Sequence, residues 1–251
     1  MSNSLTKIVE ACQYLLLNYS GAQDCRNYLN NRVNEVSQSL FQFGYFPNIE
    51  NIKVLTSLVG EDCLIDNSLI FNKEIEDSLY PRKLTFSFFE EYPLIMPYKD
   101  VYGEVVALVG RSLLSDKERK TSKYKNTTFA KSKHVFGLYE NKKSILDKGC
   151  VFVVEGQFDT IKAVECGFTN IVSLGSASMS SYQFSIINRY TNNICLLLDN
   201  DDAGEKGRKR IIEKFGDFAN INNFYLPEPY KDIDEYLMEN SYEDLTFSVR
   251  V

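Results

Sequence analysis

The sequence predicts two parts of different fold class. Residues 1–148 are expected to form an α+β part with helices and a small antiparallel sheet, and residues 149–251 an α/β part with a mainly parallel sheet and a short helical C-terminus. Three observations predict this: apolar side chains at helical spacing near the start, alternating apolar and polar side chains in the middle, and short apolar runs separated by helix-length segments after Cys150. A length of 251 residues accommodates two closely packed subdomains.

The beginning of the chain is expected to be helical. Apolar residues at positions 5, 8, 9, 12, 16 and 19 have the spacing of a half-buried helix that ends at Ser20-Gly21. Two further helices are expected over residues 24–32 and 36–43, and residues 44–51 contain turn formers.

The middle of the chain changes to strand patterns. Residues 84–88, 94–98 and 104–110 predict one small antiparallel sheet, with a turn at Lys99-Asp100. The lysine-rich segment that follows is expected to be a loop, and residues 135–146 a helix.

After Cys150, strands and helices are expected to alternate. The wholly apolar run 151–154 is typical of a strand covered on both faces. Strands are also expected over 170–173, 194–198 and 222–226, with a helix of about eleven residues after the first strand and helices over 180–190 and 203–215. A Gly/Ser loop covers 175–178, and the order implies a parallel sheet with right-handed crossovers.

Composition excludes several classes of protein. Hydrophobic residues make up 44% and charged residues 25%, as in globular proteins. No run of eighteen apolar residues occurs, so we expect a cytoplasmic protein without membrane contact. The six cysteines form no CxxC pair and His134 is the only histidine, so we expect no zinc site. Catalysis, if present, is expected to use carboxylates and a metal ion.

Charge is unevenly distributed along the chain. Between Arg111 and Cys150 there are eleven basic and four acidic residues, a net charge of +7, although the whole chain carries −6. Between Asp199 and Asp244 there are thirteen acidic and six basic residues, a net charge of −7. The first segment suits a polyanion and the second suits divalent cations, but two solvated faces would give the same counts.

Carboxylates follow three of the expected elements of the parallel sheet. In such a sheet the carboxyl ends of the strands meet at one edge, so these acids are expected to converge. Without a bridging cation they would repel one another, and hard oxygen ligands favour Mg²⁺ or Mn²⁺. The alternative is that they cap helices, a role we expect for Asp202 and Ser180. The acids are Glu155 and Asp159, Asp199 and Asp201, and Asp232 and Asp234.

The same segments resemble a known family. "VVEGQFDTIKAVECGFTNIVSLGSASMSSYQ", "LLLDNDDAGEKGRKR" and "YLPEPYKDIDEYL" are similar to the Toprim fold of bacterial-type (DnaG-like) primases, topoisomerases and some nucleases. Upstream, "YLNNRVNEVSQSLFQFGYFP", "LIMPYKDVYGEVVALVGRSL", "SKYKNT" and "FAKSKHVFGLYEN" resemble the primase catalytic core, in the same order. The resemblance covers most of residues 24–237 and is to primase specifically.

The resemblance implies roles for individual residues. Glu155, Asp199 and Asp201 match the acids that hold divalent metal, with Asp159 in support and Asp232 and Asp234 as a later pair. Gly156 and Gly175 match glycines at sharp turns beside the metals. The positions that contact template or nucleotide phosphates in the family correspond to Arg111, Lys123, Tyr124, Asn126 and Lys131.

The sequence also departs from the family pattern. Asn200 stands where glycine is usual, and Pro93-Leu94 stands where a basic residue is usual. We expect a reduced primase core of a phage or mobile element, or a fragment, without a zinc ribbon before the core or a helicase-docking domain after it. The partners expected are single-stranded DNA, ribonucleoside triphosphates, and a replicative helicase or separate template-recognition protein.

Three functions remain open from the sequence. The first is a DNA-dependent primase that makes short RNA primers by two-metal nucleotidyl transfer. The second is a Toprim nuclease that cuts phosphodiesters with the same carboxylates. The third is a degenerate, non-catalytic primase associated with a helicase.

Overall fold

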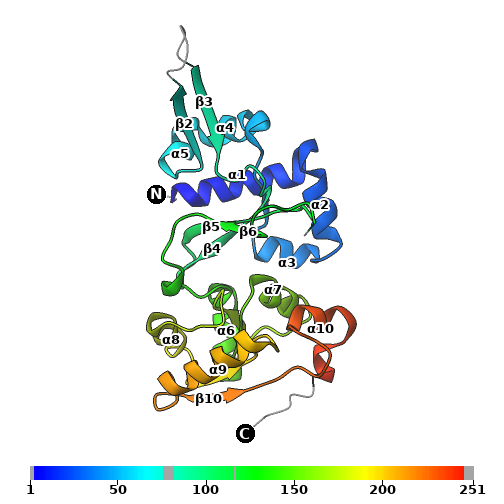
Figure 1. Ribbon diagram of the computed structural model, residues 1–251, viewed down its shortest axis with the longest axis vertical. Helices are drawn as coiled ribbons and strands as arrows, with labels where there is room; N and C mark the ends of the chain where they lie inside the picture. Colours follow the sequence, from blue (N-terminus) through cyan, green and yellow to red (C-terminus); the bar gives the residue numbers. More distant parts are fainter. Residues whose placement is uncertain (1–2, 76–81, 116, 246–251) are drawn as a thin grey trace. The chain divides into compact units, whose positions relative to one another are not determined.

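The chain folds into two compact units. A computed structural model describes residues 3–75, 82–115 and 117–245 (Figure 1). Unit 1 comprises Met1–Tyr98 and Glu104–Phe129, and unit 2 comprises Lys99–Gly103 and Ala130–Val251. The sequence analysis divided the chain at 148/149 instead. Residues 130–148 go with unit 2 because Leu138 and Ile145 are buried in its core.

Unit 1 combines several helices with a small sheet. The helices are α1 (Ser4–Asn18), α2 (Gln23–Asn30), α3 (Glu35–Leu40), α4 (Lys53–Val59) and α5 (Glu61–Asp66). Helix α1 begins at Asn3, whose side chain accepts a hydrogen bond from the backbone N of Leu5 at 3.1 Å. Its buried face includes Ile8, Cys12 and Leu15, as the apolar spacing predicts. Helices α4 and α5 were not predicted.

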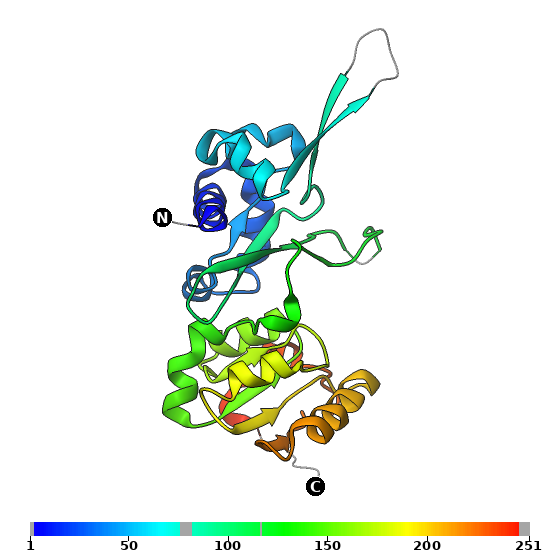
Figure 2. The ribbon, with the colours of Figure 1, turned by 90° about the vertical axis from the view of Figure 1, so that its left-hand side faces the viewer.

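The sheet of unit 1 differs in membership from the prediction. Its strands run in the order β1-β4-β5-β6, where β1 is Gly44–Tyr45, β4 Leu94–Lys99, β5 Val105–Arg111 and β6 Tyr124–Asn126. Strand β6 lies within the segment that we expected to be a loop. Strand β3 (Arg82–Ser87) was expected in this sheet, but it pairs only with β2 (Ile70–Ile75) in a separate hairpin. The Phe71 and Phe86 rings stack there with centroids 5.4 Å apart, and the hairpin projects outward from beside α5, which β2 contacts (Figure 2).

Unit 2 is a parallel sheet between two layers of helices. Its strands are β7 (Val151–Val154), β8 (Ile171–Ser173), β9 (Asn193–Leu196) and β10 (Asn220–Asn223), all parallel in the order β10-β9-β7-β8. Val151 and Val153 pack on the face covered by α6 (Leu138–Lys148), α8 (Ser181–Ile187) and α9 (Asp202–Phe215). Phe152 and Val154 pack on the opposite face, against α7 (Gln157–Glu165) and α10 (Ile233–Glu239). Both faces of β7 are therefore buried, as the apolar run predicts.

The strand order creates a switch point between β7 and β9. The chain leaves β7 through α7 and enters β8 on one side, then crosses through α8 on the opposite face to reach β9 on the other side of β7. The two connections diverge, and α/β sheets commonly bind ligands beyond the carboxyl ends of the strands at such a point. Sequence patterns predict the strands but not this order.

Among the residues that the structure describes, no helix is both long enough and apolar enough to span a bilayer.

Candidate active site

Glu155 begins the site at the end of β7. Its Oε1 accepts a hydrogen bond of 3.3 Å from the backbone N of Asp199, which follows β9. Burial raises the pKa of Glu155, and the negative charge of Asp199 raises it further. The two strands on either side of the switch point are thus linked through this carboxylate.

Asp199 and Asp201 follow β9 and have different surroundings. Asp201 caps α9, because its Oδ1 accepts from the backbone N of Ala203 at 2.9 Å and of Gly204 at 3.0 Å. The sequence analysis assigned this cap to Asp202, which is instead the first helical residue. The Gly204 N–H above all lowers the pKa of Asp201, whereas burial and then Asp232 raise the pKa of Asp199.

The remaining acids come from α7 and α10, which pack against each other. The Asp159 Oδ2 accepts from the backbone N of Gly156 at 2.8 Å, and its side chain is buried. Burial, followed by the charge of Asp232, raises the pKa of Asp159 to about 8. Asp232 caps α10 by accepting from the N of Glu235 at 2.9 Å, and burial raises its pKa. Asp234 lies in the first turn of α10, and its negative charge also raises the pKa of Asp159.

Lys231 indicates where a cation would sit. Its Nζ lies 3.5 Å from Asp199 Oδ2 and 3.3 Å from Asp201 Oδ2. Both carboxylates therefore face one cation position, and their hard oxygens fit Mg²⁺ or Mn²⁺. Within residues 3–75, 82–115 and 117–245, no group of three or more His, Cys, Asp or Glu side chains has a geometry ready to hold a metal. The acids are electrostatic neighbours without a formed coordination shell.

Two further residues position this edge: Arg208, which the sequence analysis did not single out, and Asn200, which it noted only as a departure from the family pattern. Arg208 is only 1% exposed and donates to the backbone carbonyls of Leu198 and Asp199. The Asn200 Nδ2 donates to the carbonyls of Leu226 and Tyr230, at 3.0 Å each, and so ties the end of β9 to the turn before α10. The sequence spacing could have predicted that Arg208 is buried, because Arg208 lies on the same face of α9 as the buried residues Gly204 and Ile211.

The two glycines expected at sharp turns differ. Gly175 has a φ of +76°, a left-handed conformation that favours glycine. A Cβ there would collide with Lys131, whose Nζ donates to the Gly175 carbonyl at 2.5 Å. Gly156 has an extended backbone, with a φ of −97°, so no left-handed turn requires glycine there. A Cβ at Gly156 would instead crowd the Asp159 carboxylate, at 2.8 Å from Oδ2.

In unit 1, Arg111 lies among aromatic rings. It is 5% exposed, and its guanidinium carbon lies 4.8 Å from the centroid of Tyr28 and 5.1 Å from that of Tyr124. Arg111 also donates to the Tyr124 hydroxyl. On the other flank, the guanidinium carbon of Arg32 lies 6.0 Å from the Tyr28 ring centroid. Tyr28 and Arg32 were not predicted, although their i, i+4 spacing in the expected helix was a usable signal.

The other predicted contacts of the nucleic acid are divided between the units. Tyr124 and Asn126 lie on β6 and pair with Arg111 and Val109 of β5. Lys123 precedes β6 and is exposed, and its carbonyl accepts from the N of Ser112 at 3.0 Å. Lys131 belongs to unit 2, where burial lowers its pKa. Unit 1 thus groups Arg111 with Tyr124 on one strand pair, and unit 2 places Lys131 at Gly175.

Comparisons with known proteins agree with these two units. The family model for the N-terminal domain of the DNA primase catalytic core matches residues 13–142, and a Toprim-like model matches residues 152–237. The DNA primase of Aquifex aeolicus is 31% identical over 210 residues, which cover 82% of this chain and 40% of that protein. The DNA primase of Thermotoga maritima is 26% identical over 217 residues, which cover 85% of this chain and 37% of that protein.

Solved structures show the same fold. The crystal structure of the zinc-binding and RNA polymerase domains of the Aquifex aeolicus primase matches with a TM-score of 0.76 and 26% identity, and the match covers 99% of this chain and 62% of that one. A DnaG primase catalytic domain bound to single-stranded DNA matches with a TM-score of 0.74 and 22% identity, over 96% of this chain and 79% of that one. The chain spans about two fifths of the Aquifex aeolicus relative. By the model that covers residues 13–142, the chain belongs to the family of the DNA primase catalytic core, N-terminal domain, and a Toprim-like unit follows in unit 2.

Proposed function

We propose that this chain is the catalytic core of a DNA primase, which joins ribonucleotides on a single-stranded DNA template to make short RNA primers for DNA replication. The observation that carries the proposal is the meeting of Glu155 and Asp199 at the switch point between β7 and β9. The family membership supplies the reaction class, and the proposal places that reaction in the cytoplasm.

The acids at this edge are proposed to hold divalent metal, Mg²⁺ or Mn²⁺. Glu155, Asp199 and Asp201 would be the ligands, with Asp159, Asp232 and Asp234 behind them. When bound, the ions would supply positive charge for the attacking 3′-hydroxyl and for the triphosphate. The cation position between Asp199 and Asp201, which Lys231 fills, supports this assignment.

The residues of the chain itself are proposed to orient the reacting groups and to supply charge at the ends of β7 and β9. The half-buried Glu155 has a raised pKa and accepts from the Asp199 N–H, so this carboxylate has one fixed orientation from which it can bind a cation or take a proton. Arg208 holds the carbonyls of Leu198 and Asp199, which fixes the end of β9. Because both groups are held by backbone contacts, little rearrangement is needed when the substrate arrives.

The aromatic and basic cluster of unit 1 is proposed to bind the nucleic acid. Arg111, which is 5% exposed, lies as a flat cation against Tyr28 and Tyr124, so it would attract phosphates by its charge and support rings that can stack on bases. Lys123 is an exposed cation beside it and adds a salt-dependent contact. In unit 2, Lys131 would meet a phosphate near Gly175. A replicative helicase or a separate template-recognition protein is the proposed protein partner.

One assay tests the proposed function. Purified protein is incubated with single-stranded DNA, labelled ribonucleotides and Mg²⁺ or Mn²⁺, alongside the Glu155→Gln variant. Oligoribonucleotides that require template, and that are absent with the variant, are the expected result. Cleaved template without synthesis would identify a nuclease, and neither product would identify a non-catalytic module; either outcome would overturn the proposal.

A further inference from the structure

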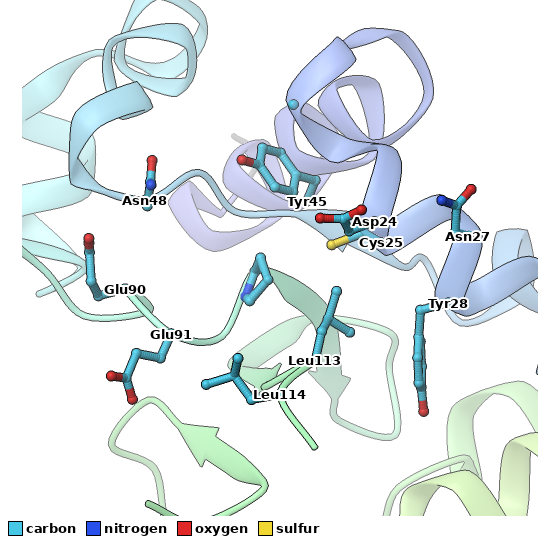
Figure 3. Close-up of a pocket in the computed structure, with 12 residues that line it drawn as sticks. Asp24, Cys25, Asn27, Tyr28, Tyr45, Asn48, Glu90, Glu91, Leu113 and Leu114 are labelled. Carbon is cyan, nitrogen blue, oxygen red and sulfur yellow. The ribbon is translucent and has the colours of Figure 1, made fainter. Parts of the chain in front are cut away.

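We propose that a pocket in unit 1 binds an unpaired nucleobase, and that it prefers bases with an exocyclic amino group, adenine, cytosine or guanine, over thymine. The pocket has a volume of about 610 Å³ (Figure 3). It lies outside the carboxylate site of unit 2, and none of the predicted site residues lines it. The inference rests on the proposed function to the extent that nucleotides must reach unit 1.

Carboxylates line the pocket on two sides. Asp24 comes from the first turn of α2, and Glu90 and Glu91 come from the turn between β3 and β4 on the other side (Figure 3). The Glu90 Oε2 also accepts from the backbone N of Ile49 at 2.9 Å, which fixes that side chain. Ionised carboxylates only accept hydrogen bonds, so a ligand group that faces them must bring N–H donors. The side-chain amides of Asn27 and Asn48, which also line the pocket, can donate or accept and therefore do not discriminate between ligands.

The rest of the lining suits a flat, partly apolar ring. Leu113 and Leu114 lie between the two acidic sides, and Pro93 also lines the pocket (Figure 3). Tyr45 lines it from β1, and its phenol hydroxyl can donate or accept a hydrogen bond. The pocket therefore combines apolar walls with a few polar groups, as sites for small molecules do.

The neighbouring cations favour a nucleotide over a basic peptide. Tyr28 lines the pocket, and the guanidinium groups of Arg111 and Arg32 lie over this ring. A cationic peptide would be repelled by these arginines, whereas a phosphate would be attracted to them. Asp24, Glu90 and Glu91 repel phosphate from the interior. Arg111 is only 5% exposed, so its charge acts from beneath the ring, and the half-buried Arg32 is the arginine that a phosphate would contact while the attached base enters the pocket.

The carboxylates determine which bases are preferred. Adenine, cytosine and guanine each carry an exocyclic amino group that donates to a carboxylate. Thymine presents carbonyl oxygens instead, and its ring N–H is its one donor. Two carbonyl oxygens facing Asp24 or Glu91 are repelled, so thymine should be the weakest ligand.

A fluorescent reporter tests this preference. The chain contains no tryptophan, so Leu114→Trp places a single indole at the pocket, at a residue that is 43% exposed. Leu58→Trp, at a residue of unit 1 that is 48% exposed and does not line the pocket, is the matched control. Titration with (dC)₈ and (dT)₈ should quench the indole of the Leu114→Trp variant with an affinity at least about fivefold higher for (dC)₈. The indole of the Leu58→Trp variant should show no such difference.

A charge variant and a second readout complete the test. In the double variant Asp24→Asn with Glu91→Gln, the amides also donate to thymine carbonyls, so the (dC)₈ to (dT)₈ ratio should approach one. Anisotropy of labelled oligonucleotides with the unmodified chain gives the same ratio without the reporter. Titration with CMP and TMP distinguishes the source of the base: a preference for CMP indicates free nucleotides, and a preference only in oligonucleotides indicates the template strand.

Other results would overturn the inference. Equal affinity for (dC)₈ and (dT)₈, with primer synthesis intact, would show that the pocket does not select a nucleobase. The proposed primase function would be unaffected by that result. Quenching of the Leu114→Trp variant by an arginine- and leucine-containing peptide, with no response to any nucleotide, would identify a protein-binding pocket. A base preference in a protein that makes no primers would support the pocket and contradict the primase function.

Discussion

The acids of unit 2 and the cations of unit 1 are held in place by different means. Backbone N–H groups fix the carboxylates, as at Glu155, Asp201 and Asp232. Ring stacking holds the main cations of unit 1, with Arg111 over Tyr28 and Tyr124. The difference teaches that a reacting centre is built on strand and helix ends, where the backbone sets positions precisely enough for chemistry. In unit 1 the proposed contacts with nucleic acid depend instead on side chains packed against rings, as Arg111 is against Tyr28 and Tyr124.

The largest effect is expected when an acid loses its charge without losing its shape. Asp199→Asn should reduce primer synthesis by at least about a hundredfold, because the cation position between Asp199 and Asp201 loses one of its two charges. The midpoint of thermal unfolding should stay the same or rise, because burial and Asp232 oppose ionisation of Asp199. Rates and melting curves of the same preparation give both values.

Asp202→Asn is the matched control for this variant. Asp202 is an exposed neighbour that lies in the first turn of α9. Its loss of charge should change synthesis by less than about twofold. An equal loss of activity in both variants would show that net charge at this edge matters, rather than the cation position.

A smaller effect is expected for the stacked cation of unit 1. Arg111→Lys keeps the charge but loses the flat guanidinium between two rings, so affinity for single-stranded DNA should fall by about fivefold to tenfold. The dependence of that affinity on salt concentration should not change.

The exposed Lys123 should have a different effect. In Lys123→Ala the slope of DNA affinity against salt concentration should be lower by about one, because one phosphate contact is lost. Identical salt slopes for the wild type and Lys123→Ala would place Lys123 outside the binding surface.

Lys231 is expected to compete with a metal ion for the carboxylates of unit 2. Because its ammonium lies between Asp199 and Asp201, a divalent ion must displace it. Lys231→Met should therefore bind Mn²⁺ about threefold to fivefold more tightly in calorimetric titrations, a modest gain because Lys231 is 53% exposed. Weaker binding by the variant would mean that Lys231 organises the ligands rather than competing for them.

The smallest effect concerns pH and the buried Asp159. Its folded pKa of about 8 lies above its ordinary value of 3.8, so folding takes up a proton between these values. The free energy of unfolding of the metal-free protein should therefore fall as pH rises through this window. Asp159→Asn should lose the part of this dependence that Asp159 contributes, so its stability should fall less steeply with pH, and it should melt a few degrees higher than the wild type at pH 8, in the presence of chelator. A constant difference between the two proteins from pH 5 to pH 8 would contradict the raised pKa.

The sequence predicted elements that have a strong periodic signal. The run 151–154 gave β7 with the observed bounds, because a strand buried on both faces shows a wholly apolar pattern. Strand β6 was missed because its residues Tyr124–Asn126 are only partly buried and show no alternation. Strand β3 was found but assigned to the wrong sheet, since alternation does not identify the partner of a strand.

The sequence predicted that the acids come together at one edge of the sheet, but not how each acid is held there. The acids at strand ends could be identified because parallel strands share one carboxyl edge. That Asp201 rather than Asp202 caps α9 depends on where the helix begins, which sequence patterns place only to within a residue or two. The support by Arg208 and Asn200 depends on long-range contacts across β9 and the turn before α10, and the pattern of the sequence does not encode these contacts directly.

One measurement tests the central claim most directly, namely that the edge carboxylates carry out the chemistry and unit 1 binds the nucleic acid. Primer synthesis and affinity for a single-stranded oligonucleotide are measured on one preparation of Glu155→Gln. The account predicts that synthesis is lost while the dissociation constant stays within about twofold of the wild-type value or falls, because a negative charge has been removed. Retained synthesis, or loss of synthesis and DNA binding together in a folded protein, would contradict it.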